Sequence, residues 1–515
     1  MPGKSRFQLH GVNRSLASLL AATILLGGCT ALGPDFVKPE VVEEATWLDE
    51  NKEISSTTPQ QNEWWKLFND PVLNTLIEKA YNQNLSLQVA GLRIYEARAQ
   101  LGIATGLQYP QSQVVGGSAT ANRLSENSPN FVPLVDNNFA NYQAGFDAAW
   151  ELDFWGRYRR GIESADANLS ATVADYDNAL VSLTAEVARV YVNIRILEER
   201  LAIAYDNIEL QQKSLNIASV RFRNGATTEL DVQQAKTNLA DTRAQVPVLT
   251  RQLRQANNAL SILMGMPPTE FTGILGEPGT IPVAPEQVTA GIPTELLRRR
   301  PDVRQAEKQA ASQSALIGIA ETDLYPRFSL LGSIGFQTSD TGSSSASDMF
   351  DSDSLAYSVG PAFSWNILNY GRLRNNVRVQ DARYQQTIVN YQNTVLTAYQ
   401  EVEDAMVGFV QAREESGIRA EGAHAAKRST EISNIQYREG AVDFQRVIDS
   451  ERALVTQQDL WILARGDISL NLIAMYKALG GGWELREGHN FISEENRNAM
   501  EERTNWGDLL QPEQK

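Results

Sequence analysis

The segment that decides the fold is WELDFWGR at residues 150–157, because a related segment, WNILNYGR, follows at residues 365–372. A second pair of motifs has the same separation of 215 residues: FRNGA at 222–226 corresponds to YREGA at 437–441. This separation is far longer than the unit of a solenoid. The two pairs therefore indicate an internal duplication, in which the chain consists of two similar halves.

These landmarks, together with the local composition, predict the organisation of the chain. In order, we expect a signal peptide at 1–28, a lipidated extended segment at 29–62, a first repeat at 63–275, a Pro/Gly-rich linker at 276–293, a second repeat at 294–480 and a polar C-terminal tail at 481–515. The tail is either flexible or wrapped around the helices, and the sequence does not decide between these alternatives.

The N-terminus is typical of a bacterial secretory leader. Basic residues precede an apolar run at 16–26 that is short for a membrane-spanning helix. The segment LGGC at 26–29 comes next and resembles the lipobox of bacterial lipoproteins. The resemblance implies a covalent lipid with palmitate chains on Cys29, and Thr30 in place of Asp implies retention in the outer membrane. The alternative is a leader without lipid and an incidental cysteine.

The composition argues against several classes of protein. The formal net charge is −16, whereas a nucleic-acid-binding protein is expected to carry a basic face. The chain has one cysteine and three histidines, and no His/Cys cluster suggests a metal site. His424 and His489 lie in polar stretches, and no Gly-x-Ser-x-Gly motif marks a hydrolase nucleophile. We therefore expect no enzyme and no cofactor beyond the lipid; a periplasmic enzyme or binding protein is the alternative class.

Both halves contain long heptad patterns. Apolar residues follow a 3/4 spacing over 176–218 and again over 373–409, which is typical of supercoiled helices. A helix over 158–222 would be roughly 97 Å long at 1.5 Å per residue. We predict helical hairpins at about 158–263 and 372–478. For these segments alone, an ordinary coiled-coil rod is the alternative.

Between the helical patterns lie segments of period two. Apolar residues alternate with polar or small ones in 142–152, 357–367 and 328–337, and more weakly in 112–122. Strands of about 10 residues with one apolar face are typical of transmembrane β-barrels. A soluble sandwich alternates in the same way and is the alternative. Pro361 is unfavourable in a strand, because proline has no N–H for the ladder.

Four predicted strands are too few for a membrane barrel, since bacterial barrels have about eight or more. Several copies must then share one barrel, and their long helices must lie side by side below it. The predicted fold class is α+β, mostly α: a transmembrane β-barrel with four strands from each chain, continuous with a long periplasmic α-helical barrel. The residue patterns require at least two copies and leave the number open.

At this point the motifs resemble those of the TolC-type outer-membrane factors, and within them the lipoprotein branch that serves resistance-nodulation-division efflux pumps. The landmarks are GPDF at 33–36, WW at 64–65, FNDP at 68–71, LLRRRPDVR at 296–304 and the two Arg-x-Gly-Ala turns. The resemblance implies a homotrimer that passively conducts drugs or other small solutes to the exterior. Its implied partners are a periplasmic adaptor protein and an inner-membrane transporter. The alternative is the outer-membrane duct of an ABC-driven type I protein secretion system.

Two glycine-containing turns mark the inner ends of the predicted hairpins. Gly225 and Gly440 supply a positive φ where one helix must reverse into the next. The resemblance implies that adaptor hairpins dock at these tips, so Arg223, Gly225, Arg438 and Gly440 are candidate adaptor contacts. The alternative is that the glycines serve only the turns.

The resemblance also implies a periplasmic gate on the second hairpin, which opens when the helices rotate outward like an iris. The predicted gate residues are Tyr437, Glu439, Asp443, Gln445, Asp449 and Arg452. In a trimer Asp449 forms a ring of three acids, and close like charges favour cation binding or partial protonation. Arg452 is expected to pair with Asp449 on the helix face. Gln445 takes the place of a hydrophobic residue in the family pattern, which indicates a polar gate.

Overall fold

The computed structural model describes residues 31–40, 47–48, 54–55, 62–127, 129, 137–289, 299–342 and 344–511. The chain divides into two units of three segments each. The sheet unit comprises Met1–Lys38, Ala97–Leu169 and Lys308–Val389, and the hairpin unit comprises Pro39–Glu96, Ser170–Glu307 and Asn390–Lys515. The predicted signal peptide and Cys29 lie outside the described residues.

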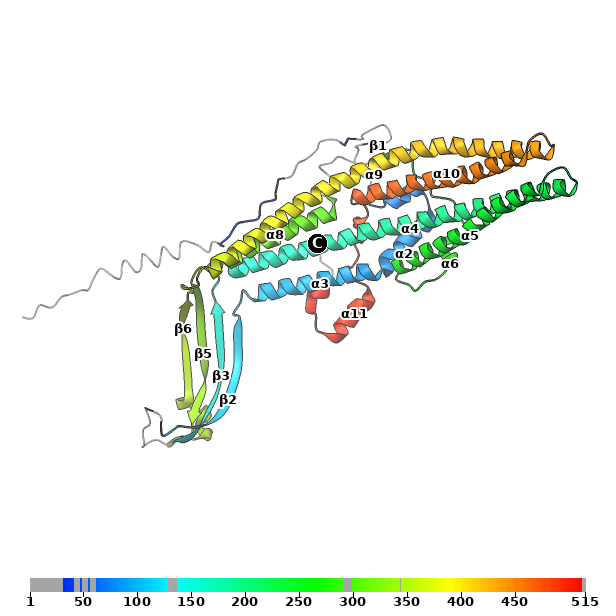
Figure 1. The fold of residues 1–515 in the computed structure, drawn as a ribbon. Helices are drawn as coiled ribbons and strands as arrows, with labels where there is room; N and C mark the ends of the chain where they lie inside the picture. The colour runs from blue at the N-terminus through cyan, green and yellow to red at the C-terminus, as the bar shows by residue number, and fades with distance from the viewer. Residues whose placement is uncertain are drawn as a thin grey trace, which may run out of the picture. The chain divides into compact units, whose positions relative to one another are not determined.

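The sheet unit contains a four-stranded antiparallel sheet (Figure 1). Its strands are β2 Ser112–Arg123, β3 Asn138–Glu151, β5 Arg327–Ser339 and β6 Leu355–Ser364. Their spatial order is β2-β3-β5-β6, which is also their order along the chain. β2 and β6 are therefore the outer strands of the sheet.

The strand register keeps residues of one kind side by side. One row across the sheet consists of Val115, Phe146, Ile334 and Tyr357. The next row consists of Val114, Asp147, Ser333 and Ser358. Because successive residues of a strand point to opposite faces, the two rows lie on opposite faces of the sheet. A shift of one residue would mix the apolar row with the mostly polar one.

The end of β6 differs from the range expected from the alternation. The period-two pattern runs to residue 367, whereas β6 ends at Ser364. The ladder ends there because its last pair is Ser364 with Arg327, the first residue of β5; the indole Nε1 of Trp365 donates to the Leu324 carbonyl at 3.0 Å. Pro361 lies within β6, opposite Leu330 of β5, although proline lacks the N–H donor of the ladder.

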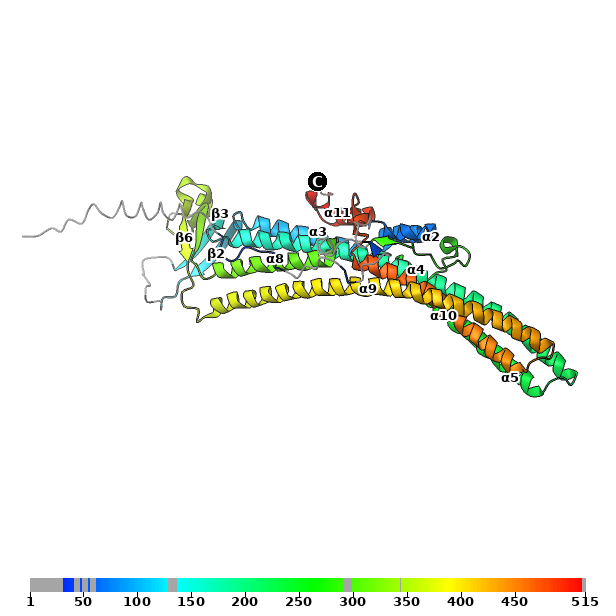
Figure 2. The ribbon, with the colours of Figure 1, turned by 90° about the horizontal axis from the view of Figure 1, so that it is seen from above.

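Four long helices carry the heptad patterns. They are α4 Arg157–Arg223 and α9 Arg372–Arg438, of 67 residues each, and α5 Glu229–Leu263 and α10 Phe444–Ala478, of 35 residues each. At 1.5 Å per residue, α4 and α9 are each about 100 Å long. Within the hairpin unit, the α4–α5 and α9–α10 hairpins run side by side (Figures 1 and 2). In the described part of the chain, no helix has both the length and the apolar character needed to cross a membrane.

Shorter elements complete the two units. They are the helices α2 Pro71–Gln83, α3 Leu85–Gly106, α6 Thr272–Leu275, α8 Pro301–Thr322 and α11 Glu494–Arg503, and the parallel strands β1 Ile54–Ser55 and β4 Val288–Thr289. Helix α2 shows why the FNDP motif matters. Asp70 caps it by accepting the N–H groups of Val72 and Leu73 at 2.9 and 3.2 Å, and Pro71 occupies the first turn, where its missing N–H is harmless.

An N-terminal strap, residues 31–35, lies against α4 and α8 in the sheet unit. The Leu32 N–H donates to the Trp155 carbonyl at 3.0 Å, and the Arg160 guanidinium donates to the Leu32 and Gly33 carbonyls at 3.0 and 3.1 Å. Gly33 has a φ of +83°, and a Cβ there would come within 2.4 Å of the Gly318 Cα. The close approach of strap and helix therefore requires glycine at the start of the GPDF motif.

The C-terminal tail, whose state the sequence left open, is folded against the start of α3. Its apolar residues Ile492, Met500 and Leu510 are buried in one cluster with Tyr95 of α3. The Asn496 side chain adds a hydrogen bond of 3.0 Å to Gln88. The tail therefore belongs to the hairpin unit as far as residue 511.

Candidate functional site

The two hairpin turns have the same backbone conformation. Gly225 and Gly440 have φ values of +71° and +80°. The Gly225 N–H donates to the Phe222 carbonyl at 2.9 Å, and the Gly440 N–H donates to the Tyr437 carbonyl at 3.0 Å. In both turns the next N–H reaches back five residues, as in a Schellman motif, and satisfies a free carbonyl of the helix end. The turn alone therefore requires glycine at both positions.

Arg221, in the last turn of α4, connects the first tip to the second. Its Nη1 donates to the carbonyls of Tyr437 and Arg438, at 2.6 and 3.3 Å, at the end of α9. Its guanidinium lies 4.7 Å from the centroid of the Tyr437 ring. A cation favours a helix C-terminus, and the aromatic ring adds a cation–π contact. The comparison of the two sequence halves did not mark this residue, because the equivalent position in the second half is Gln436.

An apolar core lies behind the two turns. Its buried members are Ala218 of α4, Val232 and Ala235 of α5, Tyr437 of α9, and Phe444, Val447 and Ile448 of α10. The rings of Tyr437 and Phe444 are 5.0 Å apart. Burial of apolar area stabilises the folded state by about 25 cal/mol per Å². Sliding one hairpin along the other would expose part of this core, so the core opposes such a movement near the tips.

A carboxyl group, Glu451, is buried where the four helices of the hairpins meet. Its side chain is 2% exposed. Its Oε1 accepts the Ser214 hydroxyl of α4 at 2.5 Å, and its Oε2 accepts the Asn238 amide of α5 at 2.9 Å. Asn434 of α9 completes the cluster, 2.9 Å from the Ser214 hydroxyl. Each of the four helices thus supplies one polar side chain to this cluster.

Burial raises the pKa of Glu451, because the low-dielectric interior disfavours the charged form. Hydrogen bonds from Ser214, Asn434 and Asn238 oppose that rise. Among the described residues, no arginine or lysine forms an ion pair with Glu451. No pattern in the sequence was used to predict this group, which among the described residues is the carboxyl buried between the helices close to the tips.

Two of the predicted gate residues lie together on the exposed face of α10. The Gln445 amide donates to the Asp449 carboxylate at 2.8 Å. The Gln234 Nε2 of α5 lies 3.5 Å from the Gln445 Oε1. Position 445 is therefore part of a hydrogen-bonded polar surface.

Arg452 does not pair with Asp449 in the described part of the hairpin unit, contrary to the expected ion pair. Its Nε donates to the Asn238 Oδ1 at 3.3 Å instead. An exposed ion pair contributes at most about 1 kcal/mol, so a hydrogen bond to a buried partner competes with it. Through Asn238, Arg452 is linked to the cluster around Glu451.

The other predicted gate residues have separate positions. Asp443 is the N-cap of α10 and accepts the Arg446 N–H at 3.3 Å. Tyr437 is buried, its hydroxyl donates to Asp231 at 3.3 Å, and burial raises its pKa. Glu439 is exposed and lies 3.6 Å from Arg438. The chain therefore does not gather Tyr437 and Glu439 into one network.

The predicted adaptor contacts all lie at the tips. Arg223, Gly225, Arg438 and Gly440 are exposed. In the part of the chain that the structure describes, no group of three or more His, Cys, Asp and Glu residues could hold a metal ion. The tips thus combine exposed arginines with a buried core and a buried carboxyl group.

The combination of a four-stranded sheet with two long helical hairpins can be compared with known proteins. The family model described as outer membrane efflux protein matches residues 76–266 and 292–481, which is more than half of the chain. The chain belongs to the outer membrane efflux protein family. The predicted resemblance to the TolC-type outer-membrane factors is thereby confirmed.

Several curated relatives of this outer membrane efflux protein match over nearly their whole length. The cation efflux system protein CusC of Escherichia coli O6:H1 is 28% identical over 466 residues, which cover 90% of this chain and 97% of CusC. The pyoverdine export outer membrane protein OpmQ of Pseudomonas aeruginosa is 29% identical, with 91% and 97% covered. The solvent efflux pump outer membrane protein SrpC of Pseudomonas putida is 29% identical, with 90% and 98% covered.

Solved structures share the fold. The outer-membrane channel OprN is 33% identical and superposes with a TM-score of 0.81, over 88% of this chain and 99% of OprN. A structure of CusC is 26% identical and has a TM-score of 0.74, over 88% of this chain and 100% of that one. The homologues of this outer membrane efflux protein are channels and not enzymes, so the prediction that the chain is not an enzyme is confirmed.

Proposed function

We propose that three copies of this outer membrane efflux protein form a passive channel across the outer membrane. Drugs or other small solutes enter it from a periplasmic adaptor protein and an inner-membrane transporter of the resistance-nodulation-division class. Membership of the family carries this proposal. The relatives are named for cations, pyoverdine and solvents, so identities of 28–29% do not select one cargo.

The sheet supports assembly into a shared barrel. Its outer strands, β2 and β6, each have one neighbour in the described sheet. Joining β6 of one copy to β2 of the next closes the sheet, and three copies of four strands exceed the minimum of about eight for a membrane barrel. The apolar row then faces lipid, and the mostly polar row faces the lumen.

The helices support a duplicated helical barrel. The hairpin α4–α5 and the hairpin α9–α10 have helices of the same lengths. The family model also matches the chain twice, once in each half. Two equivalent hairpins from each copy would line a tunnel that ends at the tips.

We also propose that Cys29 carries a lipid anchor. It precedes the strap, which is held against α4 and α8, by two residues. Because Cys29 is the single cysteine, Cys29→Ser should abolish incorporation of labelled palmitate. Label that persists in this variant would contradict lipidation at this site.

The proposed gate is polar and lies at the tips. In a trimer the exposed Asp449 side chains of α10 form a ring that narrows the tunnel, and adaptor hairpins dock beside Arg223 and Arg438 and open it. Asp449→Ala should raise the single-channel conductance in a planar bilayer. Asp508→Ala, an exposed aspartate in the tail, is the matched control and should leave the conductance unchanged. Equal conductance of wild type and Asp449→Ala would place the gate elsewhere.

Two measurements test the whole proposal. The purified membrane protein should have the native mass of three chains, and deletion should make the cells sensitive to a toxic solute. A monomer would contradict the channel. Loss of a secreted protein with unchanged solute tolerance would instead favour the type I secretion duct.

A further inference from the structure

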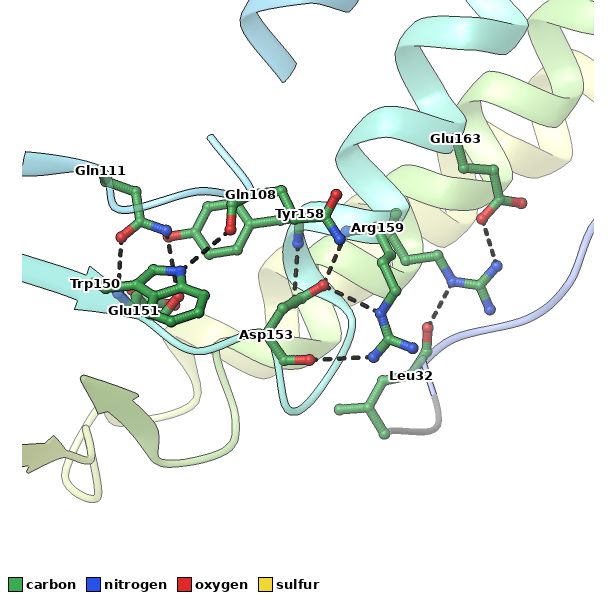
Figure 3. Close-up of polar contacts among 10 residues, drawn as sticks. Leu32, Gln108, Gln111, Trp150, Glu151, Asp153, Tyr158, Arg159 and Glu163 are labelled. Atoms are coloured by element: carbon green, nitrogen blue, oxygen red, sulfur yellow. Dashed lines mark hydrogen bonds and ion pairs between the residues drawn. The ribbon is translucent and has the colours of Figure 1, made fainter. Parts of the chain in front are cut away.

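The turn that leads from β3 into α4, residues 150–157, is covered on two sides by its own chain. On one side lies the α3–β2 connection, residues 107–111 (Figure 3). The Trp150 indole donates to the Gln108 carbonyl at 3.2 Å, and the Gln111 side chain exchanges hydrogen bonds with the backbone of Glu151 at 2.7 and 3.2 Å.

On its other side, the same turn meets the α8–β5 connection, residues 323–326. The Trp155 indole donates to the Pro326 carbonyl at 2.8 Å, and its ring lies 4.9 Å from that of Tyr325. Arg157 forms an ion pair of 2.5 Å with Asp323. These contacts follow from the strand order, because β3 lies between β2 and β5.

The equivalent turn from β6 into α9, residues 365–372, repeats the tryptophan contact of the first set. Trp365 corresponds to Trp150, and its indole donates to the Leu324 carbonyl at 3.0 Å, at the position that corresponds to Gln108. Tyr370 corresponds to Trp155, but it is 98% exposed and has a φ of +50°. A bulky residue with positive φ is strained, and such strain persists where the surroundings hold it.

The exposed side of this second turn is apolar. Leu368 takes the place of Asp153, the residue that caps α4 through the N–H groups of Tyr158 and Arg159. Leu368 is 81% exposed, and Ile367 beside it is also exposed. The turn borders an open hollow of about 690 Å³, lined by Trp365, Leu368 and Tyr370 among others.

The structure also contains a surface that matches this turn. Tyr109-Pro110, in the α3–β2 connection, corresponds to Tyr325-Pro326, on which Trp155 packs. Tyr109 is 64% exposed, and Leu107 is exposed beside it. This connection precedes β2, the outer strand at the far edge of the sheet from β6.

We propose that the β6–α9 turn of one copy packs on the α3–β2 connection of the next copy, with Tyr370 against Tyr109. The partner is a second copy of this chain. When β2 of that copy pairs with β6, residues 107–111 of that copy lie beside the β6–α9 turn. They then have the position that residues 323–326 have beside the β3–α4 turn. This inference rests on the proposed function, since it takes the closed ring of copies as given.

One difference between the two interfaces follows from the sequence. Arg372 corresponds to Arg157, but Leu107 stands where the second connection has Asp323. The ion pair is therefore not repeated, and the contact between copies is aromatic and apolar. Aromatic pairs favour offset or tilted arrangements with centroids about 4.5–7 Å apart, as the rings of Trp155 and Tyr325 have within the chain.

Cysteine cross-linking of the full-length protein in its membrane tests the contact. In the double variant Tyr109→Cys/Tyr370→Cys, oxidation by copper phenanthroline with dissolved oxygen removes two thiol hydrogens and forms one disulfide. We expect covalent species of two and three chains that reductant dissociates. When the two single variants are made together with different tags, each linked pair should contain one of each.

The controls use positions that meet within one chain. Trp155→Cys/Tyr325→Cys should form its disulfide inside the chain and give no species of higher mass. Each single variant made alone should give no linked chains. Linking of Tyr370→Cys alone would overturn the head-to-tail arrangement proposed here.

A native mass measured on the unoxidised double variant distinguishes failure of this contact from failure of the proposed channel. Absence of linked chains together with an oligomeric mass overturns this contact and leaves the proposed channel intact. A monomeric mass for the wild-type chain overturns the channel itself. As a second measurement, Tyr370→Ala should lower the temperature at which the oligomer dissociates in detergent, whereas Tyr370→Phe, which keeps the ring, should not; equal temperatures for both would also overturn the contact.

Discussion

The two hairpin tips have the same backbone and different side-chain support. Both turns place glycine at positive φ and satisfy the helix end with the same pair of hydrogen bonds. Arg221 reaches from the first tip to the carbonyls of the second, and its counterpart Gln436 is exposed. The difference teaches that turn geometry is duplicated, whereas the polar contacts that Arg221 and Glu451 make between the hairpins have no equivalent in the other half.

The largest effect is expected at the buried carboxyl group of the second hairpin. Glu451→Ala removes the acceptor of the Asn238 amide and one acceptor of the Ser214 hydroxyl, and should lower the free energy of unfolding by about 3 kcal/mol. The equivalent change in the first half, Lys236→Ala, alters an exposed side chain and should cost less than about 0.5 kcal/mol. Denaturant unfolding in detergent, followed by helical circular dichroism, measures both, and similar losses would remove the asymmetry.

A smaller loss is expected when the connection between the tips is removed. Arg221→Ala deletes the hydrogen bonds to the end of α9 and the contact with the Tyr437 ring, which together should contribute about 2 kcal/mol. Gln436→Ala, at the equivalent position, should change the free energy of unfolding by less than about 0.5 kcal/mol. The same unfolding assay compares them; a loss for Gln436→Ala as large as for Arg221→Ala would contradict the one-sided connection.

The two glycines should behave alike, because the turn backbone is shared. Gly225→Ala and Gly440→Ala each force an L-residue into a left-handed conformation and should each cost about 1–2 kcal/mol. A Cβ at Gly225 meets no atom within 4 Å, and one at Gly440 lies 3.5 Å from the Arg221 guanidinium, an ordinary contact. Unequal losses in unfolding assays would show that the tips differ in their backbones as well.

The N-cap residues of α5 and α10 should contribute unequally to the free energy of unfolding, by up to about 1 kcal/mol. Asp443 caps α10 through the Arg446 N–H, whereas Thr228, at the start of α5, makes no capping hydrogen bond with its side chain. Asp443→Ala should therefore destabilise the protein by about 1 kcal/mol and Thr228→Ala by less. Thermal melting of the two variants side by side decides the point, and a larger shift for Thr228→Ala would contradict it.

The subtlest effect is a dependence of stability on pH to which Glu451 should contribute. Because the folded pKa of Glu451 is raised above 4.5, its contribution to stability is complete below pH 4.5 and is lost as the pH rises through the folded pKa. Glu451→Gln is neutral at every pH and should remove this part of the slope. Melting temperatures from pH 4.5 to neutral test it, and identical slopes in wild type and variant would exclude Glu451 as the source.

The sequence predicted the regular parts of the fold because they depend on local periodicity. The heptads marked α4 and α9, and glycine marked both turns, since no other residue adopts that φ easily. Alternation extended β6 too far, because the strand ends where its partner β5 begins, at Arg327, and that limit is distant in the sequence.

The contacts across the tips were harder to predict. Arg221 had no equivalent in the second motif to draw attention to it. Glu451 did carry a signal, because it lies four residues after Val447 and three before Leu454, in a buried heptad position where a charged residue is unusual. The predicted ion pair of Arg452 with Asp449 is wrong. Helix spacing predicts which residues of one helix are neighbours, but it does not predict that Asn238 of another helix competes for the Arg452 side chain.

The outer strands of the sheet have a consequence for biogenesis. Each leaves a row of backbone donors and acceptors on one side, which is a template for any extended peptide nearby. A newly exported chain is therefore vulnerable for as long as it stays solitary. Since encounters between chains become rarer as synthesis slows, weak expression should lengthen this interval and increase the demand for periplasmic chaperones that shield bare strands.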